Sequence, residues 1–483
     1  MNRLVIVSNR VADMRSNSQS GGLAVGVADA LRARGGIWFG WDGTISDELG
    51  SPTVDDIGKV RTIAAPLTEA DYSEYYVGFA NSVLWPLFHY RLDLVDFRTE
   101  FYEGYMRVNE RLAETLRPEL RDDDVIWVHD YHLIPFAACL RALGCRQRIG
   151  FFLHIPFPPP DLLAASPNHS ALVEALLEYD VVGFQTSADA ANLKRYLAEQ
   201  LCRDVDEDGR VKVGERTVLI ERFPIGIDVD AFAEMARLPA SEVELDTLRQ
   251  RILGRKQIIG VDRLDYSKGL PERLSAFERL LTRHPELERA VSLLQIAPPT
   301  REDVSAYPAI RKELEGMTGS INGRFADINW TPVRYIHRAV PRERLASLFR
   351  ASQVGLVTPL RDGMNLVAKE YIAAQDPDDP GVLLLSQFAG AAEELQEALI
   401  VNPYDADDVA DRLHEALTMP RDERRHRHAM LLARIRRQDA KAWLEGFLSR
   451  LDPAGPAPRQ KAASPSSAAR RSTPAALDLG QSA

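Results

Sequence analysis

Short apolar runs recur along the chain, and longer stretches with the apolar spacing of amphipathic helices separate them. Apolar runs of roughly four to eight residues between helical stretches are typical of parallel strands that are buried on both faces of a sheet. Two series of such runs predict an α/β protein with two doubly wound, Rossmann-like domains. In the first half the predicted strands are Leu4–Val7, Ile37–Trp41, Val125–His129, Ile149–His154, Val181–Gln185 and Val218–Ile225. In the second half they are Ile258–Val261, Val291–Ile296, Val354–Thr358, Val382–Ser386 and Leu399–Val401.

The predicted boundary between the two domains lies around residues 235–255. There Pro239 and the charged stretch Ser241–Arg251 interrupt the alternation of strands and helices. We therefore expect a first Rossmann-like domain over residues 1–240 and a second over residues 241–435.

The end of the chain combines a helical stretch with a segment of different composition. Arg421–Leu451 has the apolar spacing of a helix, and its cluster from Arg424 to His428 is interpreted as a solvated face. From Asp452 onward Pro, Ala and Ser dominate, and large apolar side chains are almost absent. Because such a segment cannot bury enough surface to offset its loss of entropy on folding, residues 452–483 are predicted to form a disordered tail.

Composition and charge narrow the possible partners and the compartment. The net charge of −11 argues against nucleic acid as a partner. No apolar run approaches the roughly 20 residues needed to span a bilayer. The apolar run before Ser8 is too short to form the core of a signal peptide. Cys139, Cys145 and Cys202 form no CxxC pair and are expected to be reduced thiols. We therefore expect a cytoplasmic protein with no nucleic-acid or membrane partner.

Candidate site residues in the first half follow the predicted strands, where ligands of doubly wound sheets bind. Arg10 follows the first strand, and the pair Gly21-Gly22 precedes a helical stretch, where backbone N–H groups can approach a phosphate. His129–His132 and His154 stand at the ends of two further strands. His129 and His132 can serve equally well as ligand-binding residues or as hydrogen-bonding groups within a loop. Metal binding there is disfavoured, since no third ligand has a suitable spacing.

The second half places cations and a helix start at its strand ends. Arg263 and Lys268 lie on one short connection, where two cations can bracket a diphosphate. Gly363 and the residues after it are interpreted as a helix N-terminus, whose dipole favours a pyrophosphate. Glu370 follows Asp362 by about two helical turns, where its carboxylate can accept from ribose hydroxyls. Candidates at strand ends in two domains favour a cleft enzyme. A nicotinamide-dependent oxidoreductase is disfavoured, because the chain lacks its glycine-rich fingerprint.

Five longer motifs resemble those of the trehalose-6-phosphate synthases. They are Trp85–Tyr90, His129–His132, His154–Pro158, Arg263–Gly269 and Asp362–Glu370. The resemblance extends from about Val5 to about Phe447. It implies a GT-B fold, in which two Rossmann-like domains face a cleft and a helix over residues 436–451 returns to the first domain.

The resemblance implies a UDP-forming, retaining hexosyltransferase. Such an enzyme transfers glucose from UDP-glucose to glucose 6-phosphate and makes α,α-trehalose 6-phosphate, the first step of trehalose synthesis. It implies no cofactor, no metal, and a homo-oligomer that is a dimer or a tetramer. The acceptor attacks from the face of the leaving group, a phosphate oxygen takes the proton, and no protein nucleophile is needed.

The roles of single residues are likewise what the resemblance implies. The acceptor sugar phosphate is expected at Arg10, Tyr76, Trp85, Asp130 and Arg301. The donor is expected at Gly21, Gly22, Arg263, Lys268, Val340, Asp362, Gly363, Met364, Asn365, Leu366, Val367 and Glu370. The catalytic group is expected to comprise Asp130, His154 and Asp362.

Two features and several alternatives accompany this prediction. Asp42 stands where members of the family usually have a small polar residue. Asp122–Asp124 fits the DxD pattern of metal-dependent transferases, but it precedes a strand and is interpreted as a solvated loop at the opposite end from the ligands. The alternatives are a related transferase that uses GDP- or ADP-glucose or glycerol 3-phosphate, and a non-catalytic regulatory subunit. The presence of every expected site residue argues against the subunit.

Overall fold

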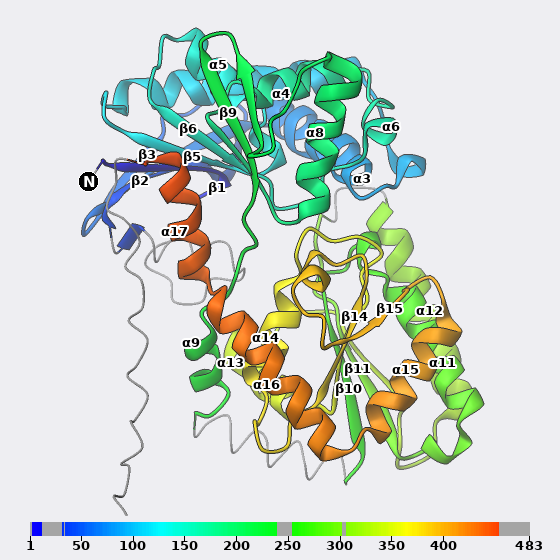
Figure 1. Ribbon diagram of the computed structural model, residues 1–483. Coiled ribbons are helices and arrows are strands. Elements are labelled where there is room, and N and C mark those ends of the chain that lie inside the picture. The colour runs from blue at the N-terminus through cyan, green and yellow to red at the C-terminus, as the bar shows by residue number, and fades with distance from the viewer. Residues whose placement is uncertain (1, 12–30, 33, 239–253, 302–305, 454–483) are drawn as a thin grey trace, which may run out of the picture.

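The protein is described from a computed structural model over residues 2–11, 31–32, 34–238, 254–301 and 306–453. Figure 1 shows two β-sheets flanked by helices, one in the upper and one in the lower half of the view. Within these described ranges the two sheets contain nine and six strands. The expected α/β fold with two separate sheets is therefore confirmed. In the described ranges no helix combines the length and the apolar character needed to cross a membrane.

The N-terminal sheet is parallel except for the short strands at its two edges. In sheet order its strands are β3 (Thr53–Ile57), β4 (Val60–Thr68), β2 (Gly36–Ser46), β1 (Leu4–Arg10), β5 (Val125–His129), β6 (Arg148–Phe152), β7 (Val181–Phe184), β9 (Arg216–Arg222) and β8 (Arg210–Val213). The apolar pattern predicted six of them and missed β3, β4 and β8. The two edge strands have mostly polar, exposed residues, because an edge strand of this sheet buries little of its surface.

Helical segments flank this sheet, and one of them has unusual winding. They are α2 (Glu69–Asp71), η1 (Tyr72–Leu84), α3 (Trp85–Phe88), η2 (Leu92–Leu94), α4 (Thr99–Leu116), η3 (Arg117–Glu119), η4 (Tyr131–Leu133), α5 (Phe136–Ala142), α6 (Pro160–Leu163), α7 (His169–Leu176) and α8 (Ser187–Leu201). The segment η1 is a π-helix, and the side chains of Asn81 and Ser82 donate to the carbonyls five residues before them at 2.8 Å each. Helical turns with this winding are rare in proteins, but those that occur are often at functional sites. This one carries Tyr76.

The C-terminal sheet is parallel throughout. In sheet order its strands are β12 (Val333–Ile336), β11 (Val291–Ile296), β10 (Lys256–Val261), β13 (Val354–Val357), β14 (Val382–Ser386) and β15 (Leu399–Val401). The helical segments beside it are η5 (Tyr266–Lys268), α11 (Leu270–Arg283), η6 (Pro285–Leu287), α12 (Ala306–Phe325), α13 (Arg342–Ala351), α14 (Leu366–Ala374), η7 (Gly390–Glu393), α15 (Ala406–Thr418) and α16 (Arg421–Arg437). The pattern missed only β12 of these strands, an edge strand in which most residues are half-exposed.

The chain crosses between the two sheets twice, and the two crossings touch. The first leads from β9 to α9 (Val229–Met235), and the second leads from α16 to α17 (Ala440–Leu451) (Figure 1). The N–H of Ala440 donates to the carbonyl of Ile227 at 3.2 Å. Helix α9 packs against α13 and α14. We therefore propose that the C-terminal domain begins with α9, although the sequence placed residues up to 240 in the first domain.

Helix α17 packs on the N-terminal sheet, where the Phe447 ring stacks on Trp127 with centroids 4.4 Å apart. The single helix predicted over Arg421–Leu451 is instead two helices, because Gln438 leaves the helical conformation. The segment expected over residues 436–451 therefore begins inside α16. The predicted tail beyond residue 453 and the boundary over residues 239–253 lie outside the described residues.

We expect Asp439→Ala to lower the free energy of unfolding by about 1 kcal/mol, because its carboxylate caps α17 by accepting from the N–H of Ala442 at 2.7 Å. Chemical denaturation measures the change. Lys441→Ala is the matched control on the same helix, since its exposed ion pair with Glu445 spans 3.9 Å and contributes little. Equal loss in both variants would contradict the capping role.

A buried ion pair fixes α14 to the first crossing. Lys369 Nζ lies 2.6 Å from Glu394 Oε2 and donates to the carbonyl of Ile225 at 2.7 Å. Both charged side chains are buried. Removing one partner of such a pair would leave a buried charge without compensation, so the arrangement resists movement of α14 relative to the crossing.

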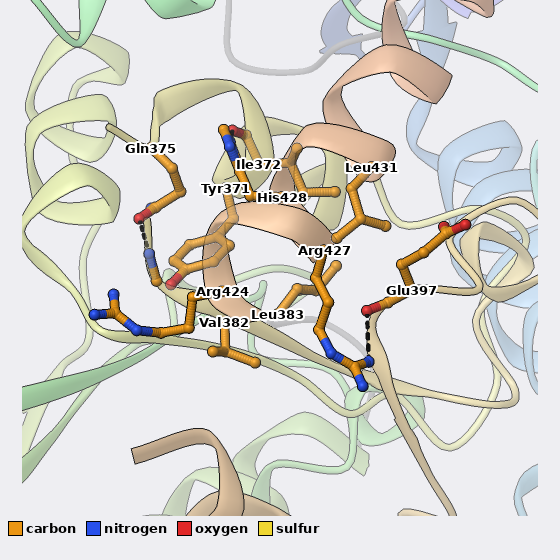
Figure 2. A pocket seen from close by; sticks show the side chains of 11 residues that line it. Tyr371, Ile372, Gln375, Val382, Leu383, Glu397, Arg424, Arg427, His428 and Leu431 are labelled. Atoms are coloured by element: carbon orange, nitrogen blue, oxygen red, sulfur yellow. Dashed lines mark hydrogen bonds between the residues drawn. The ribbon is translucent and has the colours of Figure 1, made fainter. Parts of the chain in front are cut away.

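The basic cluster of α16 is not a fully solvated face. His428 is buried, and its Nε2 donates to the carbonyl of Ile372 at 3.0 Å. Arg424 donates to the carbonyl of Pro380, and Arg427 Nη1 donates to that of Glu397 at 3.1 Å. Figure 2 shows these three side chains around a small pocket between α14 and α16, and no candidate site residue lines that pocket. The solvated-face interpretation is therefore wrong for these three residues.

Candidate active site

Two acceptor candidates meet on the indole of Trp41. The Arg10 guanidinium, at the end of β1, lies 5.2 Å from the centre of this ring. The Tyr76 ring lies 5.4 Å from the same indole and stacks on His132 with centroids 5.8 Å apart. A cation and a phenol that both lie next to one indole can each contribute to binding a phosphate.

Arg301 and Arg263 meet on a second indole, that of Trp85. The guanidinium carbon of Arg301 lies 3.6 Å from the ring centre, and that of Arg263 lies 5.8 Å from it. Arg301 is held in place, since its Nη2 donates to the hydroxyl of Tyr131 at 3.2 Å and its Nη1 to Asp265 at 3.0 Å. Trp85 is only 3% exposed. Its indole is buried next to these two cations, and its expected contact with the acceptor sugar stays a prediction.

Asp130 and His154 form a polar contact at the ends of β5 and β6. Asp130 has a positive φ of 76°, and its Oδ1 accepts from the N–H of His154 at 3.2 Å. Burial raises the pKa of the Asp130 carboxyl to about 6, although Arg301 and Arg263 oppose the shift. At pH 7 most of this carboxyl is ionised and can accept from a sugar hydroxyl.

Burial lowers the pKa of the His154 imidazole to about 3, so it is neutral at pH 7. Its Nε2 lies 3.1 Å from Nδ1 of His129. His129 is itself buried, with its pKa well below the usual value. A neutral imidazole can bind a sugar hydroxyl without adding charge to the cleft.

The donor candidates converge before α14. Lys268 Nζ lies 2.6 Å from Asp362 Oδ2, and Asn365 Nδ2 donates to the same oxygen at 3.1 Å. Burial opposes ionisation, but Lys268 and these hydrogen bonds hold the pKa of Asp362 below its usual range. Asn365 also caps α14 by accepting from the N–H of Ala368 at 3.3 Å. The helix therefore begins at Leu366, three residues after the glycine at which the sequence placed its start.

The backbone before α14 is arranged to leave donors available. The carbonyl of Met364 accepts from Ala391 at 2.8 Å, and that of Asp362 accepts from Gly390 at 3.1 Å. In the described ranges the N–H groups of residues 363–367 take no part in loop hydrogen bonds. A helix N-terminus with unpaired amides is suited to a diphosphate.

The remaining donor candidates lie beside α13 and α14. Glu370 lies on α14, burial raises the pKa of its carboxyl, and Arg342 Nη2 lies 3.4 Å away. Val340 lies on the connection from β12 to α13. Gly21 and Gly22 lie outside the described residues. The roles expected for Glu370, Val340, Gly21 and Gly22 stay predictions.

The two halves of the site are in backbone contact. A Cβ on Gly363 would lie 2.2 Å from the carbonyl oxygen of His154. On the other side of this loop, a Cβ on Gly390 would lie 1.9 Å from the carbonyl oxygen of Gly363. The donor loop of one domain is therefore packed directly against the strand end of the other.

Three residues that hold Arg301 were not singled out from the sequence: Tyr131, Asp265 and Tyr307. Tyr131 and Asp265 stand within the quoted motifs, next to or near residues with assigned roles, and that position was the only indication available. Nothing in the sequence placed Tyr307, whose hydroxyl accepts from Arg301 Nη1 at 3.1 Å, beside the site.

The acidic triplet Asp122–Asp124 lies at the amino end of β5, away from the candidates at its carboxyl end. Its interpretation as a solvated loop is wrong for Asp124, which is buried and accepts from Arg3 Nε and Nη2 at 2.8 and 2.7 Å. Elsewhere in the described ranges, His284, Glu286 and His414 could hold an ion, but none of them is a candidate site residue.

We expect full activity after dialysis against EDTA, because Arg263, Lys268 and helix-end amides supply positive charge at the expected diphosphate position. Initial rates before and after chelation provide the measurement, with a Mg²⁺ or Mn²⁺ addition to each sample. Loss of turnover that the added ion restores would contradict the prediction.

Comparison with known proteins agrees with the geometry. Residues 2–453 match the model of glycosyltransferase family 20. Over 457 residues the chain is 50% identical to the trehalose-6-phosphate synthase of Klebsiella pneumoniae. This match covers 94% of this chain and 96% of that protein. Over 453 residues it is 49% identical to the trehalose-6-phosphate synthase of Sodalis glossinidius, with 93% and 96% covered.

Solved structures give the same result. An α,α-trehalose-phosphate synthase (UDP-forming) of Burkholderia xenovorans, in complex with glucose 6-phosphate, is 51% identical with a TM-score of 0.90, over 93% of this chain and 100% of that one. An E. coli trehalose-6-phosphate protein bound with UDP-2-fluoro glucose is 48% identical with a TM-score of 0.89, over 93% and 99% of the two chains. The expected GT-B architecture is confirmed. With a family model over residues 2–453 and relatives similar over nearly their full length, the chain belongs to glycosyltransferase family 20.

Proposed function

We propose that this chain transfers glucose from UDP-glucose to glucose 6-phosphate with retention of configuration, and releases α,α-trehalose 6-phosphate and UDP. The observation that carries the proposal is the pair of guanidinium groups on one indole. Arg263 follows β10 and Arg301 follows β11, and they lie 5.8 and 3.6 Å from the centre of the Trp85 ring. Two cations next to one indole are suited to a donor and an acceptor that each carry phosphate.

The donor half is suited to stabilise a departing UDP. As the bond from glucose C1 to the β-phosphate oxygen breaks, negative charge grows on that phosphate. Arg263, Lys268 and the N–H groups at residues 363–367 supply positive potential there without having to reorganise. Glu370, half-buried on α14, is proposed to accept from the ribose hydroxyls, and Val340 to contact the base.

The acceptor half is suited to hold a sugar phosphate beside the bond that breaks. Arg10, Tyr76 and Arg301 are proposed to bind its phosphate, and Asp130 a ring hydroxyl. The acceptor hydroxyl then forms the new bond to C1 from the leaving-group face, and its proton passes to the β-phosphate oxygen. His154 and Asp362 are proposed to orient the transferred glucose. Because the acceptor attacks the face from which UDP departs, configuration is retained without a protein nucleophile.

The test measures UDP release by the purified enzyme with UDP-, GDP- and ADP-glucose as donors and with glucose 6-phosphate, glucose and glycerol 3-phosphate as acceptors. We expect the highest kcat/KM with UDP-glucose and glucose 6-phosphate, and a product identical to α,α-trehalose 6-phosphate by NMR. Preference for another pair would reassign the substrates. Absence of turnover with every pair would favour a non-catalytic role.

The family resemblance also leads us to propose a homo-oligomer. Light scattering of the purified chain would give its mass, and a monomer at assay concentrations would contradict a dimer or tetramer.

A further inference from the structure

Asp265 occupies a position between the two halves of the site. It lies on the loop from β10 to α11, between Arg263 and Lys268, and its side chain is fully buried. Its Oδ1 accepts from the N–H of Ser267 at 2.9 Å, within the donor loop. Its Oδ2 accepts from Arg301 Nη1 at 3.0 Å, on the acceptor side. One carboxylate therefore joins the loop proposed to bind the diphosphate to the arginine proposed to bind the acceptor phosphate.

This carboxylate is ionised throughout the neutral range. Burial would raise its pKa, but Arg301 and Lys268 outweigh burial and lower the pKa of Asp265 to about 2. The hydroxyl of Tyr307 donates a further hydrogen bond to Oδ2 at 3.1 Å. A fixed negative charge with all its described contacts made by donors can hold a guanidinium in one orientation.

The contacts of Arg301 determine which of its donors remain. Nη1 donates to Asp265 and Tyr307, and Nη2 donates once to Tyr131. A guanidinium has five N–H groups, and in the described ranges no hydrogen bond uses Nε or the second hydrogen of Nη2. Nε and Nη2 lie along one edge of the group. Arg3 uses the same edge to bind both oxygens of Asp124 in this protein. Nε and one hydrogen of Nη2 are therefore available to an anion while Nη1 stays on Asp265.

We propose that Asp265 is a positioning residue that orients Arg301 toward the phosphate of the acceptor and couples this orientation to the donor loop. The proposal rests on the proposed function. The coupling route is short: Asp265 fixes Ser267, and the next residue, Lys268, pairs with Asp362 before α14. One carboxylate thereby links the donor loop to the acceptor arginine.

The experiment is a double-mutant cycle with Asp265→Asn and Arg301→Ala. Asparagine keeps the shape and an oxygen for Ser267 but removes the charge that holds Arg301. We expect Asp265→Asn to raise KM for glucose 6-phosphate by about tenfold or more, with kcat and the Kd of UDP changed by less than about threefold. In the Arg301→Ala background the same substitution should add almost nothing, because its effect passes through Arg301.

Asp124→Asn is the matched control. It removes the charge from a second buried Asp–Arg pair, at the opposite end of the strand that leads to Asp130. We expect a loss of stability by thermal unfolding in both variants, but a change in KM for glucose 6-phosphate only in Asp265→Asn. If that variant does not fold, Asp265→Glu retains the charge one methylene away and should still raise this KM.

Two results would overturn the proposal: unchanged KM for glucose 6-phosphate in both Asp265 variants, or fully additive effects with Arg301→Ala. Failure of the proposed function is seen separately, in the wild-type enzyme. If the proposed function fails, the wild-type enzyme releases no UDP with glucose 6-phosphate. The positioning role is judged instead from differences between variants of an active enzyme.

Discussion

Gly363→Ala is expected to lower kcat by at least about 100-fold, because a misplacement of about 1 Å between reacting groups costs this much. The added methyl would lie 2.2 Å from the carbonyl oxygen of His154, far inside van der Waals contact. Neither side of this contact is a flexible side chain. The donor loop must move away from the strand end that carries His154, and the glucose that we propose to lie there moves with it.

The loop has no room to retreat on its other side. There the Cα of Gly390 packs on the carbonyl of Gly363, where a Cβ would lie 1.9 Å from that oxygen. Gly316→Ala is the matched control, since nothing lies within 4 Å of its Cβ position on α12. It should leave kcat unchanged and raise helix stability slightly. Wild-type kcat in Gly363→Ala would contradict the close approach of the two domains.

Most strands that are buried on both faces could be predicted from the sequence, although the interior and mostly buried strand β4 was missed. The strands Val125–His129, Val291–Ile296, Val382–Ser386 and Leu399–Val401 have the bounds that their apolar runs indicated. Edge strands such as β8 and β12 could not be predicted in this way, since half-exposed residues leave no apolar run. The end of α16 was missed because Gln438 interrupts the helix without a proline or glycine to indicate it.

The site could be predicted at the level of single residues but not of their contacts. The family resemblance selected Arg301, but it did not show that its charge is met by Asp265, 36 residues earlier, and by the hydroxyl of Tyr131, 170 residues earlier. Likewise the motif selected Trp85, but it did not show the two guanidinium groups that lie next to its ring. Sequence spacing indicates which edge of a sheet a residue occupies, and the side-chain partners follow only from the packed structure.

Arg263→Ala and Arg301→Ala should separate the donor and acceptor halves of the site. Arg263 is exposed, and its charge is proposed to stabilise the departing β-phosphate, so its loss should weaken UDP binding and lower kcat. Arg301 is held by Asp265 and is proposed to bind the acceptor phosphate, so its loss should mainly raise KM for glucose 6-phosphate. A charge-assisted contact contributes about 1.5–3 kcal/mol, which predicts a loss of roughly one to two orders of magnitude in kcat/KM for each variant.

Calorimetric titration of UDP into the two variants distinguishes these effects, with initial rates over a range of glucose 6-phosphate concentrations. Arg324→Ala is the control, since this arginine lies on the surface of α12 and pairs with Glu278 at 3.1 Å, and it should change neither quantity. Equal loss of UDP affinity in Arg263→Ala and Arg301→Ala would show that the division into donor and acceptor cations is wrong. Normal UDP affinity and normal kcat in Arg263→Ala would exclude its role at the diphosphate. Because both guanidiniums share the Trp85 ring, a small change in UDP affinity of Arg301→Ala, about threefold or less, is compatible with the division.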